Sequence, residues 1–197
     1  QSGVCLRMVQ HNDPPDHAAA PQGPPQPTEV PPASSAPQTH FHPFRHQRDR
    51  NLITQAADYL ARSGFYWGPL DVDEAHARLA SLPVGTFLIR DSTQTDIFFT
   101  LSYRAEDGPT SVRVLLKNGT FSLDGSKHSF PCIFSLLDFY ITSPKKSLKR
   151  PYRGDAPQTL QDLSRRAVVR TYGRDSIDRL PVSSGLKDFV NSYPFSI

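Results

Sequence analysis

Apolar positions change their spacing along the chain, and each spacing predicts a different element. Between residues 51 and 63 they recur at intervals of three and four, which predicts an amphipathic helix that Gly64 would end. Its apolar face consists of Leu52, Ile53, Ala56, Tyr59 and Leu60. The segment Asp71-Val72-Asp73-Glu74 has the form of a capping box and predicts a second helix over residues 73–81.

Three strands are predicted next, at residues 86–90, 97–104 and 110–116. The first is a continuous apolar run, which suits a strand buried on both faces. The other two alternate apolar and polar residues, and Asn118-Gly119 then predicts a two-residue hairpin turn. A helix at residues 131–141 follows. The expected fold class is α+β, with a central antiparallel sheet flanked by two helices.

Arg90 stands where the first predicted strand gives way to a polar turn. An arginine keeps its charge in a protein and, when buried, needs an anion or a full set of acceptors. Ser92 and Thr93 follow in a turn rich in hydroxyl and backbone N–H groups, which can form an anion-binding nest. These residues predict a phosphate site. An ion pair between Arg90 and Asp91 or Asp96 would account for the same seven-residue segment equally well.

Residues 65–144 resemble an SH2 domain, the module that binds phosphotyrosine peptides. The resemblance rests on Phe65-Tyr66-Trp67-Gly68-Pro69-Leu70, followed by the predicted helix and by Thr86-Phe87-Leu88-Ile89-Arg90-Asp91-Ser92. It implies that Arg90 takes the phosphate bidentately, that Ser92 and Thr93 cap it, and that Arg113 flanks the phosphotyrosine ring. Asp73 and Ser111 stand where many SH2 domains carry an arginine and a histidine, so the resemblance implies a less basic pocket than usual.

Residues 1–38 hold nine prolines and no aromatic residue, and we expect them to be disordered because they cannot bury enough surface to offset chain entropy. Their proline pairs could bind SH3 proteins; a solvated tail is the plainer alternative. Met8 is the only methionine, so residues 1–7 are expected to precede the natural start.

Residues 39–50 place two phenylalanines beside basic residues in a polar surrounding, a composition typical of peptide anchors. Docking on the chain's own domain is the alternative. This segment resembles the kinase inhibitory region of the suppressor of cytokine signalling family, and residues 51–64 resemble that family's extra helix before the SH2 domain. The resemblance implies that His40, Phe41, Phe44 and Arg45 form a pseudosubstrate for a Janus kinase.

Residues 145–157 are expected to form a basic linker. Its run from Lys145 to Arg153 is either a solvated segment or a nuclear import signal. Residues 158–197 contain two short helical stripes with too little core to be stable alone, so we expect this small all-helical unit to dock on another chain. The first stripe consists of Leu160, Leu163, Ala167 and Val168, and the second of Leu186, Phe189, Val190 and Tyr193.

That last unit resembles the SOCS box, which binds elongin B and elongin C and a cullin. Leu160 matches the leucine that enters elongin C, and Leu163 and Ser164 follow it; Ser164 stands where the motif prefers cysteine. Leu180 and Pro181 match the first half of the cullin-contact motif, which implies weak binding to cullin 5.

Composition limits the remaining function classes. The net charge of +3 suits any acidic partner, but the basic segments lack the interleaved aromatic residues that favour single-stranded nucleic acid. There is no glycine-rich phosphate loop and no metal-spaced set of histidines and cysteines, so we expect no cofactor, no metal and no enzyme. Cys5 and Cys132 are the only cysteines; Cys132 is expected to be a buried thiol in a reducing compartment. No apolar run has the length of a membrane span.

We therefore interpret the sequence as a cytoplasmic adaptor that suppresses cytokine signalling through Janus kinases. It would dock on a phosphotyrosine of a Janus kinase or cytokine receptor, block the kinase groove with residues 40–46, and recruit ubiquitination machinery. The alternatives are a phosphotyrosine-binding scaffold without inhibitory activity, and entry into the nucleus through the basic run.

Overall fold

The structure is a computed structural model that describes residues 46–143, 147–154 and 157–197. The predicted disordered tail and the segment His40 to Arg45 lie outside these residues. The elements within the described part are, in order, α1 (Gln47–Ser63), α2 (Val72–Ala80), β1 (Thr86–Asp91), β2 (Phe99–Arg104), β3 (Pro109–Lys117), β4 (Thr120–Leu123), α3 (Ile133–Thr142), β5 (Arg150–Pro151), α4 (Leu160–Tyr172), the 3₁₀ helix η1 (Arg174–Arg179) and α5 (Ser184–Asn191).

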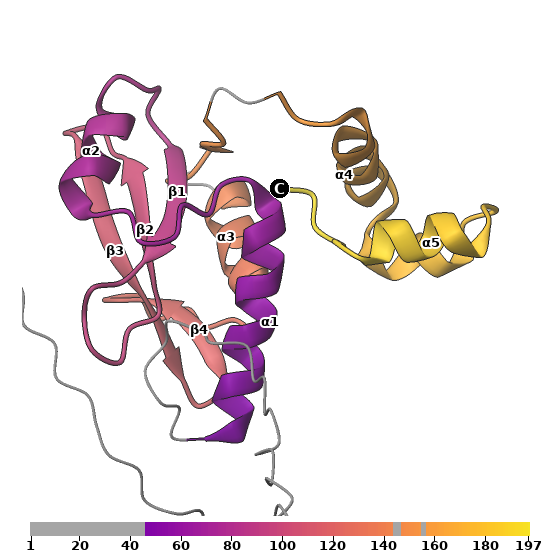
Figure 1. Cartoon of the computed structure of the whole chain (residues 1–197), viewed down its shortest axis with the longest axis horizontal. Helices are drawn as coiled ribbons and strands as arrows, with labels where there is room; N and C mark the ends of the chain where they lie inside the picture. The colour runs from indigo at the N-terminus through magenta and orange to yellow at the C-terminus, as the bar shows by residue number, and fades with distance from the viewer. Residues whose placement is uncertain (1–45, 144–146, 155–156) are drawn as a thin grey trace, which may run out of the picture. The chain divides into compact units, whose positions relative to one another are not determined.

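The strands form one sheet in the order β4-β3-β2-β1-β5 (Figure 1). All neighbours are antiparallel except β1 and β5, which are parallel. The predicted hairpin turn joins β3 to β4, and both of its residues have positive φ, 51° at Asn118 and 71° at Gly119. This backbone is the one for which Asn-Gly is favoured, since it matches the twist of the flanking strands.

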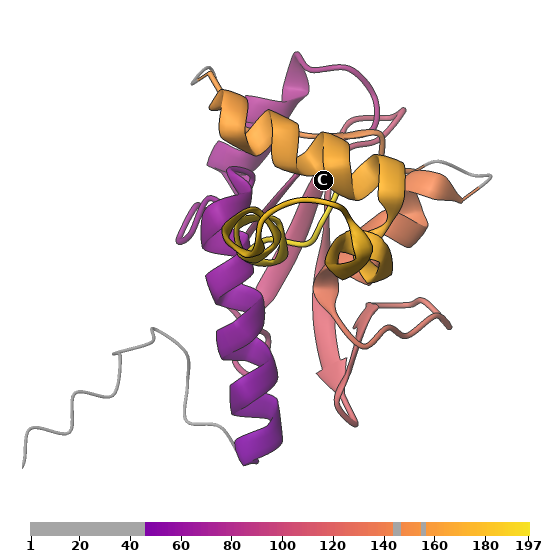
Figure 2. The ribbon, with the colours of Figure 1, turned by 90° about the vertical axis from the view of Figure 1, so that its right-hand side faces the viewer.

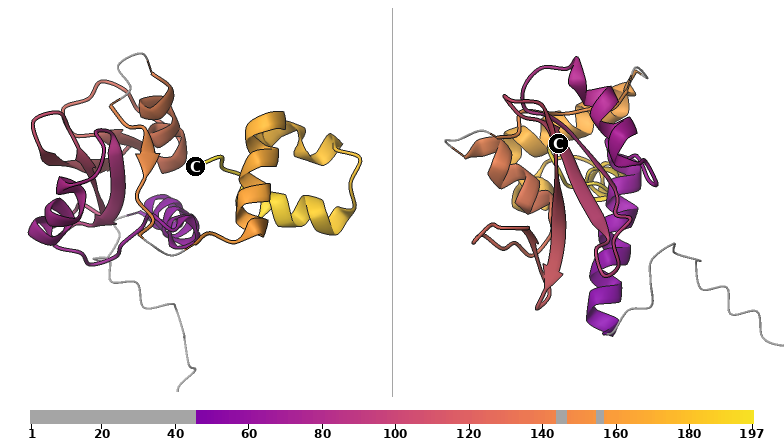
Figure 3. Two further views of the ribbon diagram at one scale, coloured as in Figure 1. Left: turned by 90° about the horizontal axis from the view of Figure 1, so that it is seen from above. Right: turned by 90° about the vertical axis from the view of Figure 1, so that its left-hand side faces the viewer.

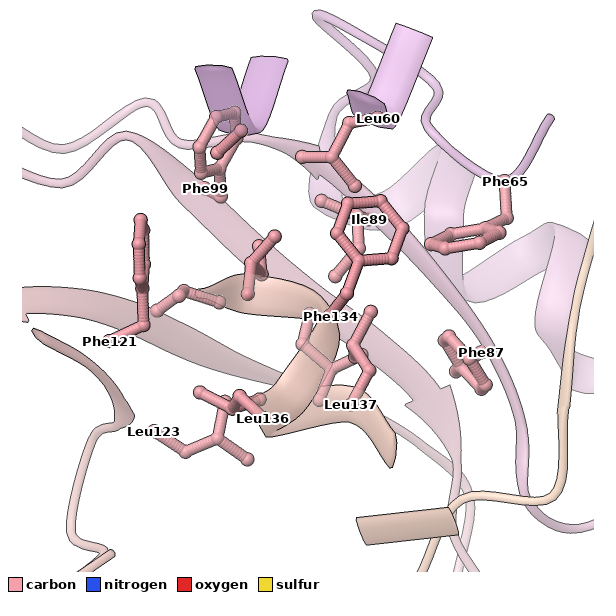
Figure 4. Close-up of a cluster of buried hydrophobic side chains, with 14 of the residues drawn as sticks. Leu60, Phe65, Phe87, Ile89, Phe99, Phe121, Leu123, Phe134, Leu136 and Leu137 are labelled. Carbon is pink, nitrogen blue, oxygen red and sulfur yellow. The ribbon is translucent and has the colours of Figure 1, made fainter. Parts of the chain in front are cut away.

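Strand β1 is buried along its whole length, and its residues alternate between two apolar clusters. Phe87 and Ile89 belong to the larger cluster, with α1 and α3, whereas Leu88 packs with residues of α2. Helix α2 therefore covers one face of the sheet, and α1 and α3 cover the other (Figures 1 and 3). Figure 4 shows the larger cluster, where Leu60 of α1 and Phe134 of α3 approach Ile89 of β1.

Helix α1 begins at Gln47, four residues before the predicted start. Its first turn carries no apolar residue, so hydrophobic spacing could not reveal it; the Gln47 amide donates to Asn51 Oδ1 at 2.8 Å instead. The predicted end is confirmed by Gly64 in the left-handed conformation, φ 75°. Ile53, Ala56 and Leu60 are buried in the larger cluster, as the spacing predicts.

Side chains cap the other two helices of this domain. Asp71 Oδ1 accepts a hydrogen bond of 2.7 Å from the Glu74 backbone N–H and starts α2 one residue before the predicted helix. Cys132 caps α3, and its Sγ accepts from the Ser135 N–H at 3.4 Å. The prediction of a buried thiol is therefore wrong: Cys132 is only half-buried, because a capping side chain lies at the end of its helix.

The predicted basic linker contains an element that the sequence analysis missed. Arg150 and Pro151 form β5, which extends the sheet beside β1. The next residues are anchored as well: the Tyr152 ring stacks on Trp67 with centroids 5.2 Å apart, and Arg153 Nε donates to the Ser63 carbonyl at 3.0 Å. From residue 150 to 153 the chain is therefore a part of the folded domain rather than a solvated linker.

Helices α4, η1 and α5 pack together around a small core of Val169, Ile177 and Val190 (Figure 3). The expected stripe that continues α5 to Tyr193 is wrong, because α5 ends at Asn191. Tyr193 instead belongs to the larger cluster of the sheet domain, and the Phe195 ring stacks on Phe134 with centroids 4.0 Å apart. The end of the chain thus reaches the face covered by α1 and α3 (Figure 2).

Candidate functional site

Arg90 is almost fully buried near the end of β1, with 5% of its surface exposed. Its Nε donates to Ser102 Oγ at 3.1 Å, and its Nη1 lies 3.4 Å from the Leu70 carbonyl and 3.3 Å from that of Asp91. The ion pairs between described residues do not include Arg90. The Asp91 carboxylate accepts a short hydrogen bond from Tyr66 Oη, so it faces a phenol. These contacts favour an anion site over an ion pair at the strand end.

A chain of hydroxyl groups continues from Arg90 to α2. Ser102 Oγ lies 2.8 Å from Ser111 Oγ, and Ser111 Oγ lies 2.9 Å from His76 Nε2. The sequence analysis expected a poorly basic pocket because Ser111 replaces a histidine, and it missed His76. In the fold, α2 brings the His76 imidazole within hydrogen-bonding distance of the Ser111 hydroxyl group. Helical spacing places His76 next to the buried Ala75 and three residues before the buried Leu79, but no local pattern shows that it reaches Ser111.

A cavity of about 590 Å³ opens over the Arg90 guanidinium. All four residues predicted to bind phosphotyrosine line it, although they come from β1, β3 and the loop between β1 and β2. The lining residues are Val72, Arg90, Ser92, Thr93, Gln94, Thr100, Ser111, Val112, Arg113 and Asp124. The cavity joins a cationic floor to hydroxyl groups at its rim, a combination that suits a phosphate.

Contacts at the rim fix the second arginine. Arg113 Nε donates to Asp124 Oδ2 at 2.9 Å, and its Nη1 donates to Gln94 Oε1 at 3.0 Å. The loop is ordered by Ser92, whose Oγ accepts from the Gln94 N–H at 3.1 Å. Arg113 therefore lines the same cavity as Arg90, and Asp124 balances much of its charge.

Burial sets the electrostatics of the floor. Removal from water lowers the pKa of Arg90, and the nearby Asp71 carboxylate partly opposes that shift. The guanidinium stays charged at neutral pH, so it is a desolvated cation with an open cavity on one side. An anion with two oxygens in one plane could complete its coordination. Among the described residues, no group of histidine, cysteine and carboxylate side chains has the arrangement of a metal site.

A second surface of interest is the outer face of α4. Leu160 and Leu163 are exposed there, with 81% and 46% of their surfaces accessible, and Ser164 is exposed beside them. Leu180 and Pro181 lie in the turn between η1 and α5, with Leu180 half-buried and Pro181 exposed. Large apolar side chains on a small helical unit indicate a surface that another protein covers.

Comparison with known proteins places both regions in families. Residues 65–140 match the SH2 domain, and residues 156–191 match the SOCS box. Suppressor of cytokine signaling 1 from Homo sapiens is 47% identical over 159 residues, covering 81% of this chain and 75% of that protein. The chain belongs to the suppressor of cytokine signalling family. Suppressor of cytokine signaling 1 from Mus musculus is 45% identical over the same shares, and Suppressor of cytokine signaling 2 from Mus musculus is 34% identical over 74% of this chain and 82% of its own.

Membership in the suppressor of cytokine signalling family confirms the predicted fold class, an SH2 domain followed by a helical SOCS box. Among the described residues, no helix combines the length and the apolar character needed to cross a bilayer. The four residues named for the kinase-inhibitory role, at positions 40, 41, 44 and 45, lie outside the described part of the chain.

The geometry predicts that removing the Ser102 hydroxyl group, which accepts a hydrogen bond from Arg90, lowers the free energy of unfolding. In Ser102→Ala the Nε of a buried guanidinium loses its acceptor, and an unsatisfied buried group costs about 1–3 kcal/mol. We expect the free energy of unfolding, measured by chemical denaturation, to fall by that amount. Ser122→Ala makes the same chemical change on β4, where no hydrogen bond of the hydroxyl is recorded, and should change it little. Equal effects would mean that Ser102 does not support Arg90.

Proposed function

We propose that this protein is a negative regulator of cytokine signalling that binds phosphotyrosine through its SH2 domain. The observation that carries the proposal is the cavity over Arg90, which is lined by all four residues that the sequence resemblance assigns to phosphotyrosine binding. Family membership supports the pathway, since the relatives are named as suppressors of cytokine signalling. The expected ligands are phosphorylated Janus kinases and cytokine receptors.

The proposed mechanism is binding rather than catalysis. The phosphate of the ligand would accept two hydrogen bonds from the Arg90 guanidinium, while hydroxyl and N–H groups around Ser92 and Thr93 cap its outer oxygens. The side chain of Arg113 would lie beside the ring. The protein then acts as a non-enzymatic adaptor in the cytoplasm. Its SOCS box presents Leu160 and Leu163 to the elongin pair and joins the bound kinase to a cullin ubiquitin ligase.

The kinase-inhibitory role is the finer part of the proposal. Residues 40–45 precede α1 by a single residue, so docking through the SH2 domain would hold them near the kinase at high effective concentration. A weak contact of Phe41 and Phe44 with the substrate groove could then inhibit well. The second candidate function is a phosphotyrosine-binding scaffold that does not inhibit the kinase. The two candidate functions therefore differ in whether Phe41 and Phe44 contact the kinase.

Nuclear entry through residues 145–153 is a further possibility that the fold restricts. Arg150 lies in β5, and the Tyr152 N–H donates to the Phe87 carbonyl at 2.6 Å, so this half of the run has its backbone engaged in the domain; the Arg153 side chain is also anchored to the Ser63 carbonyl. An import receptor that needs an extended segment would have to compete with β5. The cytoplasm is therefore the compartment that we propose.

Replacement of Arg90 tests phosphotyrosine binding. Arg90→Lys keeps the charge and loses the planar fork, and disrupting a buried charged pair typically costs about 2–5 kcal/mol. We expect the affinity for phosphotyrosine peptides from kinase activation loops, measured by calorimetry, to fall at least about tenfold. Arg104→Lys on β2, outside the cavity, is the matched control and should bind normally. Unchanged affinity in the folded Arg90 variant would refute the assignment of the pocket.

The SOCS box is tested by Leu160→Ala combined with Leu163→Ala. Both side chains are exposed in the isolated chain, so the variant should keep its unfolding midpoint. In a complex they would be buried, and truncation of a buried leucine costs about 2–5 kcal/mol. We expect capture of elongin B and elongin C from a purified mixture to be lost, whereas Val84→Ala on the SH2 domain captures them normally. Retained capture by the double variant would contradict the proposal.

The inhibitory segment is tested by Phe41→Ala combined with Phe44→Ala, and by a chain that starts at His46. The second variant keeps α1 intact, because that helix begins at Gln47. Both should bind phosphopeptide with unchanged affinity and lose inhibition of a purified Janus kinase in vitro. If the shortened chain inhibits as strongly as the full chain, the protein acts by docking and ubiquitination alone, and the scaffold alternative holds.

A further inference from the structure

A second basic cavity lies between β5 with its flanking residues, α3, and α4, outside the site described above. It has a volume of about 710 Å³. Five cationic side chains line it, three from the segment around β5 and two from α4. They are Lys149, Arg150, Arg153, Arg166 and Arg170. Asp138 is the one acidic side chain among the described residues that line the cavity.

Within the part of the chain that the structure describes, the charge of these five cations is only partly offset, since the Asp162 carboxylate acts on Arg153 and Arg166. None of the ion pairs between described residues includes any of the five. Arg166 is 8% exposed, and its recorded hydrogen bond goes to a neutral amide, Gln158 Oε1. Arg153 and Arg166 repel each other. Burial is the larger cause, and the positive charge of Arg166 the next, of a shift that lowers the pKa of Arg153 to about 10. Like charges gathered on a concave surface from two elements repel one another, and an anion bound between them would relieve that repulsion.

The size of the cavity sets the class of anion. Ligand sites commonly have volumes of about 300–1,000 Å³, and this cavity lies within that range. A single phosphate is only a few times larger than the roughly 30 Å³ share of a water molecule and would leave most of the space empty. A compact ligand with several phosphate groups would fill it and meet cations on both walls.

We infer that the cavity between β5 and α4 binds a small polyphosphate of the inositol polyphosphate class. Arg150 and Arg153 contact it from the SH2 side, and Arg166 and Arg170 contact it from the SOCS box. The bound ligand joins α4 to β5 and adds to the anchoring that Tyr193 and Phe195 provide. It would thereby fix the direction in which the SOCS box projects from the phosphotyrosine site.

Calorimetric titration of the full chain with myo-inositol hexakisphosphate tests this inference. We expect one ligand per chain, binding that persists when a phosphotyrosine peptide saturates the Arg90 cavity, and much weaker binding of inorganic phosphate. The variant Arg150→Gln with Arg170→Gln should bind roughly tenfold or more weakly, because it loses two charged donors. Both side chains are exposed and have no recorded hydrogen bond, so the variant should fold.

The control is Lys117→Gln with Lys127→Gln, which removes the same charge from exposed positions outside the cavity. It should bind like the unaltered chain. Arg166→Gln, if it folds, should weaken binding further than the exposed pair does. The inference is overturned if no ligand binds, if the control pair weakens binding equally, or if the phosphopeptide displaces the ligand. Tighter, Arg150- and Arg170-dependent binding of a short single-stranded oligonucleotide would assign the surface to nucleic acid instead.

Discussion

Burial of β1 on both faces is the constraint on which the proposed phosphotyrosine site depends. Phe87 and Ile89 hold the strand against α1 and α3, and Leu88 holds it against α2, so the strand can neither slide nor rotate without losing one apolar cluster. Arg90 continues the same alternation. Its guanidinium therefore points to the α2 side at a depth where water cannot fully solvate it, and Ser102 with two carbonyl oxygens supplies the partial coordination that burial requires.

The same core reaches the SOCS box through the end of the chain. Tyr193 is almost fully buried among residues of α1 and α3, and the Arg62 Nη1 donates to the Ser192 carbonyl at 2.7 Å. The box by itself has only a few buried apolar residues, too few to stabilise an independent domain of this size. The SH2 domain of the same chain therefore covers part of the apolar surface that we expected a second chain to cover. The outer face of α4 stays exposed.

Features encoded by neighbouring residues could be predicted from the sequence, and features that depend on distant register could not. Gly64, the Asp71 cap and the Asn118-Gly119 turn act within four residues, and each occurs as expected. The approach of His76 to Ser111 depends on how α2 lies over the sheet, and the pairing of β5 with β1 joins residues more than sixty positions apart. No local pattern marks either one. Helical spacing assigns Tyr193 to the apolar stripe of α5, because the spacing continues past Asn191, but the helix ends at Asn191 and Tyr193 packs in the core of the sheet domain.

The charged groups around the Arg90 cavity differ in how much they can contribute to the binding of a phosphate. At the rim, Asp124 Oδ2 accepts hydrogen bonds from both Nε and Nη2 of Arg113, and Asp73 adds a carboxylate in the first turn of α2. Such a partly exposed pair contributes little to stability, but its carboxylate offsets a charge that would otherwise attract phosphate at long range. Arg90 remains as the deeply buried cation. A phosphate would interact with it strongly only after entering the cavity fully, and not while it stays at the rim. If this cavity binds phosphotyrosine as proposed, one buried cation and a balanced rim would give the residues flanking the phosphotyrosine a larger share of the binding free energy, and so would favour selection among phosphorylated partners over uniform affinity for them.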